Sequence, residues 1–209
     1  MASLPPALRR TSWPLRPVLA ALVHSAPHEE WPRAGWIGHD VRFAWGPIPP
    51  PTAAEPGTMW VADPEAAAVL ATSGLHAWPR TRWVWPRSMA PEFADDGVER
   101  GVDPAALREL APLIDPGATP PPCVLVDSTG LVAVCGAWAA AEGEVEIEVD
   151  VAERARGRGL GQRMAAAYIG DVLAAGLRPR WDSGTEASER LARRLGFRVS
   201  RRWVAWVSM

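Results

Sequence analysis

One stretch of the chain, residues 144–167, constrains the fold more than any other. It begins with Glu144–Val151, in which acidic residues alternate with valine and isoleucine. A period of two predicts a β-strand with one acidic and one apolar face. Three glycines separated by single residues follow, and an alanine-rich run then predicts a helix over Leu160–Ala175. A strand, a glycine-rich loop and a helix in succession indicate an α/β fold.

The glycine-rich loop has the composition of a phosphate-binding site. Glycine lets the backbone approach a ligand closely, and the first N–H groups of the following helix have no partner within it. Together with the helix dipole and the nearby arginines, they would attract phosphate oxygens. The candidate residues are Arg156, Gly157, Arg158, Gly159, Leu160, Gly161 and Gln162. From these residues alone, a tight connection is an equally good interpretation, because no Walker lysine follows and the spacing differs from the dinucleotide fingerprint.

Beyond residue 95 the secondary-structure patterns are clear. Cys123–Trp138 predicts two strands joined by a turn at Asp127–Gly130, and Val145–Val151 predicts the next strand. Four further elements are predicted: a helix from Asp103-Pro104 to about Leu113, a short strand ending at Trp181, a helix over Glu186–Leu195 that ends at Gly196, and terminal strands from Arg198 onward.

The first part of the chain, residues 1–94, is rich in proline and tryptophan. One segment has two interpretations: a helix that begins at Asp63-Pro64, or a hairpin that turns at Ser73-Gly74. We favour the hairpin. We expect residues 1–94 to form an α/β region packed on a core made by residues 95–209. The other predicted elements of this region are a helix over residues 17–26 and strands over Thr58–Ala62 and Thr81–Trp85.

Two motifs resemble the GNAT superfamily of acyl-CoA-dependent acetyltransferases. Arg156–Gly161 matches the family's R/Q-x-x-G-x-G/A signature and lies, as in that family, between a strand and a helix. Downstream, residues 186–197, EASERLARRLGF, resemble the family's helix that ends in Gly-Phe. Residues 178–197 and the strand VEIEVDV are similar to one branch of the superfamily, which resembles the zwittermicin A resistance acetyltransferase. The resemblance covers Cys123–Phe197.

This resemblance implies a fold, a cosubstrate and further contacts. The fold would be a mixed, twisted sheet with helices on both faces. The cosubstrate would be acetyl-CoA or another short acyl-CoA, without a metal, and the activity that of an acyl-CoA-dependent N-acyltransferase. The pantetheine would pair like an extra strand with the backbone around Val149 and Val151. Ser183, Thr185 and Ser188 stand where family members contact the pantetheine or its thiol, and some arginines of residues 186–197 could meet the adenosine phosphate.

The chain also departs from the family pattern. Thr185 stands where the branch usually has asparagine, and Gln162 where it often has threonine. Ala192 occupies the position at which many members carry a tyrosine general acid, and the one tyrosine, Tyr168, lies inside the predicted helix. The general acid is therefore left open. Two alternative functions therefore stay open. The protein could be a non-catalytic acyl-CoA-binding module, or it could catalyse thioester hydrolysis or O-acylation.

The alternating strand supplies the candidate base. Its carboxylates, those of Glu144, Glu146, Glu148 and Asp150, share one face, and unpaired carboxylates are too costly to bury in a dry core. This face is either solvated, with arginine partners on neighbouring strands, or it lines the acceptor cleft. We favour the cleft, because the family's corresponding strand is central. Clustered carboxylates suit a base and attract a cationic amine. Glu148 is our first choice for the base and Glu146 our second.

Composition bounds the remaining possibilities. The net charge of −2 gives no case for nucleic-acid binding, and no apolar run approaches the roughly 20 residues of a membrane helix. All 22 basic residues are arginine, which excludes a lysine-based mechanism. Cys123 and Cys135 fit neither a disulfide scaffold nor a zinc site, so we expect free thiols in a reducing cytoplasm. The expected partner is a small-molecule amine, bound by a monomer or a homodimer.

Overall fold

The computed structural model describes residues 34–37, 41–44, 59–62, 64–86, 98–101, 103–111, 114–141 and 143–207. They belong to two compact units, one formed by Met1–Thr81 with Arg201–Met209 and the other by Arg82–Ser200. The predicted helix over residues 17–26 and Asp63, at which the alternative helix would begin, lie outside the described residues. The predicted domain boundary at residue 94 differs from this division into units, and it stays a prediction.

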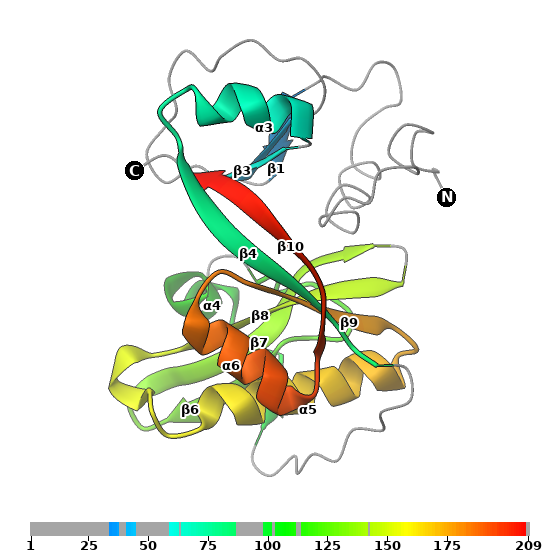
Figure 1. Cartoon of the computed structure of the whole chain (residues 1–209). Coiled ribbons are helices and arrows are strands. Elements are labelled where there is room, and N and C mark those ends of the chain that lie inside the picture. Colours follow the sequence, from blue (N-terminus) through cyan, green and yellow to red (C-terminus); the bar gives the residue numbers. More distant parts are fainter. Residues whose placement is uncertain are drawn as a thin grey trace. The chain divides into compact units, whose positions relative to one another are not determined.

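The second unit is built on a mixed β-sheet (Figure 1). Its strands lie in the order β4-β9-β8-β7-β6-β5. Their bounds are His76–Val84 for β4, which enters this unit at Arg82, Glu99–Arg100 for β5, Cys123–Asp127 for β6, Gly130–Ala141 for β7, Glu144–Val151 for β8 and Arg178–Ser183 for β9. β8 is antiparallel to β7 and parallel to β9, so the predicted mixed α/β sheet is confirmed. The predicted turn between β6 and β7 is confirmed as well.

Helices cover both faces of this sheet. They are α4 (Pro104–Leu110), α5 (Leu160–Ala174) and α6 (Glu186–Leu195). Two neighbouring residues of β6 show the division: Cys123 packs in the core with α5 and α6, whereas Val124 packs with α4. Successive residues of a strand point to opposite faces. α4 therefore lies on one face and α5 and α6 on the other, as predicted.

The helix boundaries agree with the sequence signals. Asp103 begins α4, and its carboxylate accepts a hydrogen bond from the Ala105 N–H at 3.0 Å. α4 ends at Leu110, earlier than the predicted end near Leu113. α5 and α6 match their predicted ranges, and Gly196 ends α6 in the left-handed conformation at φ 97°.

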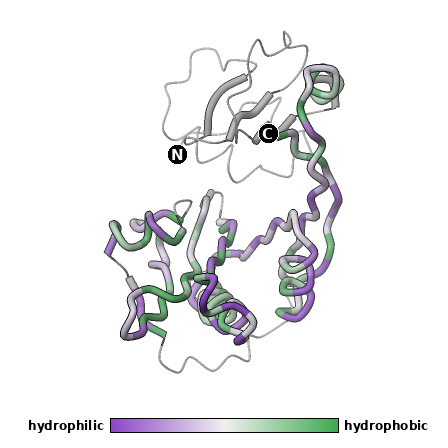
Figure 2. Tube along the Cα trace, turned by 90° about the vertical axis from the view of Figure 1, so that its left-hand side faces the viewer, coloured by the Kyte–Doolittle hydropathy of each residue, from purple (hydrophilic) through white to green (hydrophobic). Residues whose placement is uncertain are grey.

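The core of the second unit lies between the sheet and the helices α5 and α6. Phe197 packs edge-on against Trp85 at 5.1 Å between ring centroids and against Trp181 at 5.8 Å. Hydrophilic and hydrophobic residues alternate along the described trace, as expected for elements with one buried face (Figure 2). None of the helices in the described ranges is long and apolar enough to cross a membrane.

The first unit contains strands in the order β1-β2-β3-β10-β4 and the helix α3. The hairpin predicted at Ser73-Gly74 is wrong, because α3 occupies the segment before it. The alanines of this segment favour a helix. Near the end of α3, the hydroxyls of Thr72 and Ser73 donate hydrogen bonds to the Val69 carbonyl. Gly74, at φ 73°, turns the chain into β4. The bounds are Ala34–Ile37 for β1, Val41–Ala44 for β2, Met59–Ala62 for β3, Pro64–Ala71 for α3 and Arg198–Val207 for β10.

Candidate functional site

The glycine-rich loop connects β8 to α5 through the short 3-10 helix η1 (Glu153–Ala155). Gly157 and Gly159 have φ values of 75° and 77°, a conformation that other residues rarely adopt. Gly159 is the N-cap of α5, and its carbonyl accepts from the Arg163 N–H at 3.1 Å. The N–H groups of residues 160–162 precede this first helical bond, so the helix itself gives them no partner. The loop thus presents a row of backbone donors at the positive end of α5.

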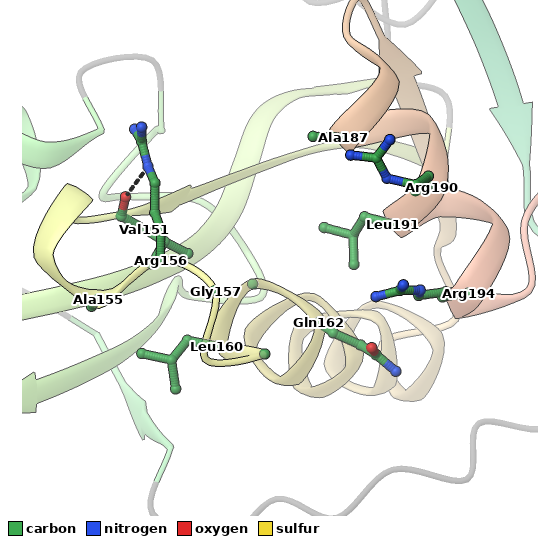
Figure 3. A pocket seen from close by; sticks show the side chains of 12 residues that line it. Val151, Ala155, Arg156, Gly157, Leu160, Gln162, Ala187, Arg190, Leu191 and Arg194 are labelled. Carbon is green, nitrogen blue, oxygen red and sulfur yellow. Dashed lines mark hydrogen bonds between the residues drawn. The ribbon is translucent and has the colours of Figure 1, made fainter.

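A pocket of about 270 Å³ lies between this loop and α6 (Figure 3). Three arginines line it, and none of its lining residues is acidic. Backbone donors, a helix N-terminus and arginine side chains in one concave site favour an anionic ligand with several phosphates. The lining residues are Val151, Ala155, Arg156, Gly157, Gly159, Leu160, Gly161, Gln162, Ala187, Arg190, Leu191 and Arg194.

For the α6 wall of this pocket, the resemblance implied only that some arginines of residues 186–197 would meet the adenosine phosphate, and it named no individual residue. Ala187, Arg190, Leu191 and Arg194 recur at helical spacing and form one face of α6. This spacing could have been recognised in the sequence. Without the position of α5, however, it does not indicate which arginines face the loop. Arg193 instead lies over the Trp83 ring, 5.3 Å from its centroid.

The predicted cofactor residues divide into two groups. Seven line the pocket: Val151, Arg156, Gly157, Gly159, Leu160, Gly161 and Gln162. The other five, Val149, Arg158, Ser183, Thr185 and Ser188, do not line it. Three of the five have clear roles within the fold. Ser183 Oγ accepts from Trp83 Nε1 at 2.7 Å, and Ser188 Oγ accepts from Trp181 Nε1 at 2.9 Å. Thr185 caps α6 by accepting from the Ser188 N–H at 3.2 Å. Their contacts with a cofactor stay predictions.

β8 and β9 pair at one end only. Their parallel register runs from Glu144 opposite Arg178 to Glu146 opposite Arg180. β8 then continues to Val151 and β9 to Ser183 without further pairing between them. The backbone edge of β8 beyond Glu146 therefore lacks β9 as a ladder partner. This edge leads toward the pocket, which Val151 lines.

Arginines occupy the paired end of the acidic strand. Glu144 forms ion pairs with Arg178, at 3.3 Å, and with Arg180. Glu146 is only 1% exposed and forms a buried ion pair with Arg82 of β4. The predicted arginine partners on a neighbouring strand are thus found for Glu144, which pairs with β9. Glu146 is buried and not solvated, and its partner Arg82 lies on β4, one strand beyond β9.

Asp182 of β9 completes the buried group around Arg82. Its carboxylate lies 3.2 Å from Arg82 Nε, and both side chains are at most 5% exposed. Arg82 therefore links β8 to β9 at the point where their pairing ends. One guanidinium held between two carboxylates offsets part of the cost of burying all three charges.

The other end of the acidic strand is half-buried and lies beside the pocket. Burial raises the pKa of the Asp150 carboxyl above its ordinary value, while the charge of Arg156 acts in the opposite direction. Glu148 lies opposite Gly136 of β7. A Cβ atom at Gly136 would lie 2.5 Å from Ile114 Cγ2, so the segment after α4 packs closely against the sheet there. Ile114 thus lies over Gly136, on the face of the sheet that also carries Glu148.

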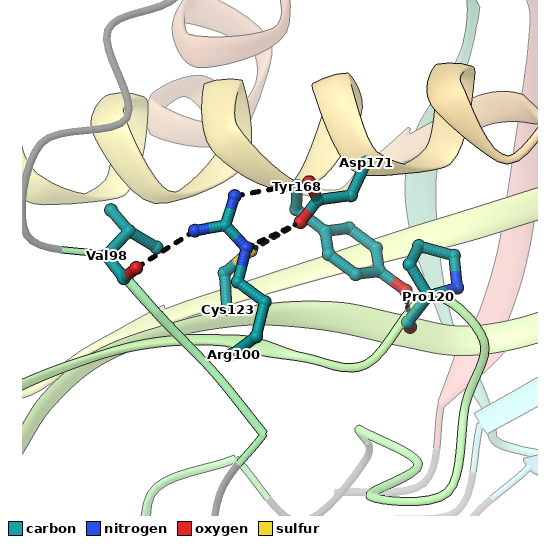
Figure 4. Close-up of polar contacts among 6 residues, drawn as sticks. All are labelled: Val98, Arg100, Pro120, Cys123, Tyr168 and Asp171. Carbon is teal, nitrogen blue, oxygen red and sulfur yellow. Dashed lines mark hydrogen bonds and ion pairs between the residues drawn. The ribbon is translucent and has the colours of Figure 1, made fainter.

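Tyr168 is held away from a general-acid role (Figure 4). Its buried hydroxyl donates to the Pro120 carbonyl at 3.1 Å. Burial is also the main reason why the pKa of Tyr168 is raised above its ordinary value. At the position of the family's tyrosine, Ala192 is fully buried. Neither residue supplies an acid at the pocket.

The two cysteines are buried free thiols, as expected. Burial raises the pKa of Cys135 well above its ordinary value, which keeps it neutral and unreactive. Cys123 Sγ lies 3.3 Å from Asp171 Oδ2, beside the ion pair between Arg100 and Asp171 (Figure 4). No group of three or more metal-ligating side chains occurs in the part of the chain that the structure describes.

Comparison with known proteins identifies the fold. The family model of the GNAT acetyltransferases matches residues 122–206. A GNAT-family acetyltransferase from Novosphingobium aromaticivorans is 24% identical, with a TM-score of 0.54 over 63% of this chain and 64% of that one. A GCN5-related N-acetyltransferase-like protein from Streptococcus suis is 18% identical, with a TM-score of 0.56 over 85% of this chain and 84% of that one. This chain therefore has the GNAT fold, and its match spans under two thirds of the Novosphingobium protein. No curated protein matches the sequence.

Proposed function

We propose that the protein is an N-acetyltransferase, which moves an acetyl or another short acyl group from coenzyme A to a primary amine of a small, cationic molecule. The GNAT fold and the family match over residues 122–206 support an acetyl-transfer function. The observation that carries the proposal is the pocket. Arg156, the glycines of the loop and the start of α5 form a site suited to a pyrophosphate, beside the end of β8 that does not pair with β9.

Coenzyme A would occupy the pocket with its pyrophosphate on the loop wall. Arg156 would contact this pyrophosphate, and a hydrogen bond from its Nε to the Val151 carbonyl at 3.2 Å holds the side chain at the pocket (Figure 3). The residues of the pocket would hold the nucleotide, and bound acetyl-CoA would supply the acyl thioester. The resemblance to the zwittermicin A resistance branch belongs to this proposal as well.

The pantetheine arm would follow the edge of β8 that β9 leaves after Glu146. Backbone N–H and C=O groups around Val149 and Val151 are suited to pair with its amides, as a further strand would. A backbone N–H in this stretch would stabilise the negative charge that develops on the thioester oxygen during attack. In this arrangement the amine nitrogen bonds to the acyl carbon, and the C–S bond breaks to release the coenzyme thiol.

Glu148 is our proposed general base. It accepts the proton that the attacking amine loses, directly or through a water molecule. Glu146 is our second candidate, but it is only 1% exposed and its carboxylate is already bound by Arg82. Glu148 and Asp150 would also attract a cationic acceptor to this end of the strand. The group that protonates the leaving thiolate stays open, because neither Tyr168 nor Ala192 serves this purpose.

An amine panel tests the proposal. The purified protein is incubated with acetyl-CoA and individual amines, and released thiol is measured against controls without amine. Thiol release that depends on a cationic amine is the expected result. Release without any amine would indicate hydrolysis, and binding of acetyl-CoA without release would indicate a non-catalytic module. A preference for acidic acceptors would contradict the proposed role of the acidic strand.

A further inference from the structure

The pairing of β8 with β9 ends where the charge on β9 changes sign. The parallel register runs as far as Glu146 opposite Arg180, and at both of its ends an arginine of β9 lies opposite a glutamate of β8. Continued by two residues, this register would place Asp182 opposite Glu148. Like charges directly opposite each other destabilise a sheet. A longer ladder would therefore bring two carboxylates together, and this opposes pairing beyond Glu146.

On the acidic face of the sheet, Asp182 is bound to β4 instead. Its side chain is 4% exposed, and its carboxylate lies 3.2 Å from Arg82 Nε. β4 is the neighbour of β9 on the side away from β8. Arg82 also pairs with Glu146. One guanidinium group thus contacts the last residue of β8 that pairs with β9 and the next acidic residue of β9.

A second contact binds the same part of β9 to β4 on the opposite face. Ser183 Oγ accepts a hydrogen bond from Trp83 Nε1 at 2.7 Å, and both residues are 1% exposed. Asp182 and Ser183 are neighbours on β9, and their partners Arg82 and Trp83 are neighbours on β4. Because successive residues of a strand point to opposite faces, one contact lies on each face of the sheet. The end of β9 is therefore held to β4 on both faces.

We propose that Arg82 and Asp182 are positioning residues for the cosubstrate. Their ion pair holds the end of β9 on β4, and this leaves the edge of β8 beyond Glu146 to the pantetheine arm of coenzyme A. The inference rests on the proposed function, since it assumes that the arm follows this edge. Neither residue has a part in the chemical step.

Two ligands separate the contribution of the arm from that of the nucleotide. Coenzyme A carries the arm, whereas adenosine 3′-phosphate 5′-diphosphate has the same nucleotide and pyrophosphate without it. Isothermal titration gives Kd for each ligand, and the ratio of the two Kd values measures what the arm contributes. A general loss of folding or of the phosphate site would change both Kd values together and would leave this ratio unchanged.

The test variant is Asp182→Asn. It keeps the shape of the side chain, removes the charge that attracts Arg82 and opposes Glu148, and leaves Arg82 paired with Glu146. We expect Kd for coenzyme A to rise about tenfold, while Kd for the nucleotide stays near the wild-type value. A charge-assisted hydrogen bond is worth a factor of about 10 to 100 in an equilibrium constant, and this factor bounds the loss.

Two further variants serve as controls. Asp182→Glu retains the charge and should keep most of the contribution of the arm. Arg178→Met removes an ion pair of Glu144 at the other end of β8 and should leave the ratio of Kd values unchanged. Circular dichroism and thermal unfolding establish that each variant is folded. Asp182→Asn is preferred to Arg82→Met because it leaves the buried ion pair with Glu146 in place.

Three results would overturn the inference. The first is an unchanged ratio of Kd values in Asp182→Asn with both affinities at the wild-type level. The second is an equal loss of affinity for both ligands in this variant, which would assign Asp182 a general role in folding. Both of these leave the proposed function intact. The third is a wild-type protein that does not bind coenzyme A, which would overturn the proposed function together with this inference.

Discussion

The two ends of β8 share one sequence pattern and differ in their surroundings. At the first end, Glu144 and Glu146 lie where β8 pairs with β9, and arginines of β4 and β9 neutralise them. At the second end, Glu148 and Asp150 lie where β8 no longer pairs with β9 and the chain approaches the glycine-rich loop. The same alternation of carboxylates thus lies among paired strands with arginine partners at one end and beside the pocket at the other. The two ends differ because β8 pairs with β9 only as far as Glu146.

The register explains why the first end is structural. Arg178 and Arg180 lie directly opposite Glu144 and Glu146, where cross-strand pairs of opposite charge stabilise a sheet. Beyond Arg180, the corresponding position of β9 is Asp182, which turns to Arg82. The change from arginine to aspartate along β9 therefore occurs where the two strands separate.

The largest expected effect, on the free energy of unfolding, comes from removing the buried ion pairs at the first end of β8. Arg82→Met removes the cation that lies against both Glu146 and Asp182. Truncating one partner of a buried ion pair costs about 3–5 kcal/mol, because the remaining charge stays desolvated. Urea unfolding at neutral pH should therefore show a loss of this size in the free energy of unfolding.

The matched control for this prediction is Arg178→Met. Arg178 also pairs with a carboxylate of β8, but its side chain is 47% exposed. Exposed pairs contribute about 0–1 kcal/mol, so we expect a loss within this range. Similar losses for Arg82→Met and Arg178→Met would show that burial does not distinguish the two pairs.

A second prediction concerns the pocket beside the other end. Gly161→Asp places a negative charge at the start of α5, where the pyrophosphate is proposed to bind. Affinity for coenzyme A in calorimetry should fall by about 100-fold or more, because a carboxylate repels phosphate and competes for the N–H donors.

Gly161→Ala is the control for size. An added Cβ atom would lie 3.5 Å from Val151 Cγ2, which is an ordinary contact, and Gly161 does not need a left-handed backbone. Its affinity for coenzyme A should stay near that of the wild type. Equal losses in the alanine and aspartate variants would assign the effect to packing and would contradict the phosphate site.

The smallest expected effect concerns Asp150. Burial raises the pKa of its carboxyl in the folded state, so folding disfavours the ionised form. This cost is absent below the unfolded pKa, appears as pH rises, and is complete above the folded pKa. Asp150→Asn should therefore raise the free energy of unfolding by roughly 0.5 kcal/mol or less at neutral pH, with no gain at low pH. Lower stability at neutral pH would show that the attraction of Arg156 outweighs burial.

Most of the second unit could be predicted from local patterns. Period-two alternation, capping residues and glycines located its strands and helices, since these signals act within a few residues. The hairpin prediction at Ser73-Gly74 was wrong because it, too, rested on a local signal. Its turn dipeptide is equally compatible with the end of a helix, and the alanines, together with the Thr72 and Ser73 hydroxyl bonds to Val69, decide for α3.

The site was only partly predictable. Apart from Arg158, the predicted loop residues line the pocket. They follow one another in the chain, so a local motif was enough to identify them. Arg190 and Arg194 come from a helix that only the tertiary fold brings to the loop. The alternation in β8 likewise showed which carboxylates share a face. It could not show that Arg82, far away in the sequence, pairs with Glu146.

The central claim is that the two ends of β8 have different tasks and that Glu148 is the base. The most direct test compares kcat of Glu148→Gln and Glu144→Gln at neutral pH with the best acceptor amine. We expect Glu148→Gln to lower kcat by roughly 10²–10³-fold, with partial recovery at high pH and unchanged affinity for coenzyme A. Glu144→Gln should keep kcat near the wild-type value. A near-normal kcat in Glu148→Gln, or equal losses in both variants, would contradict the account.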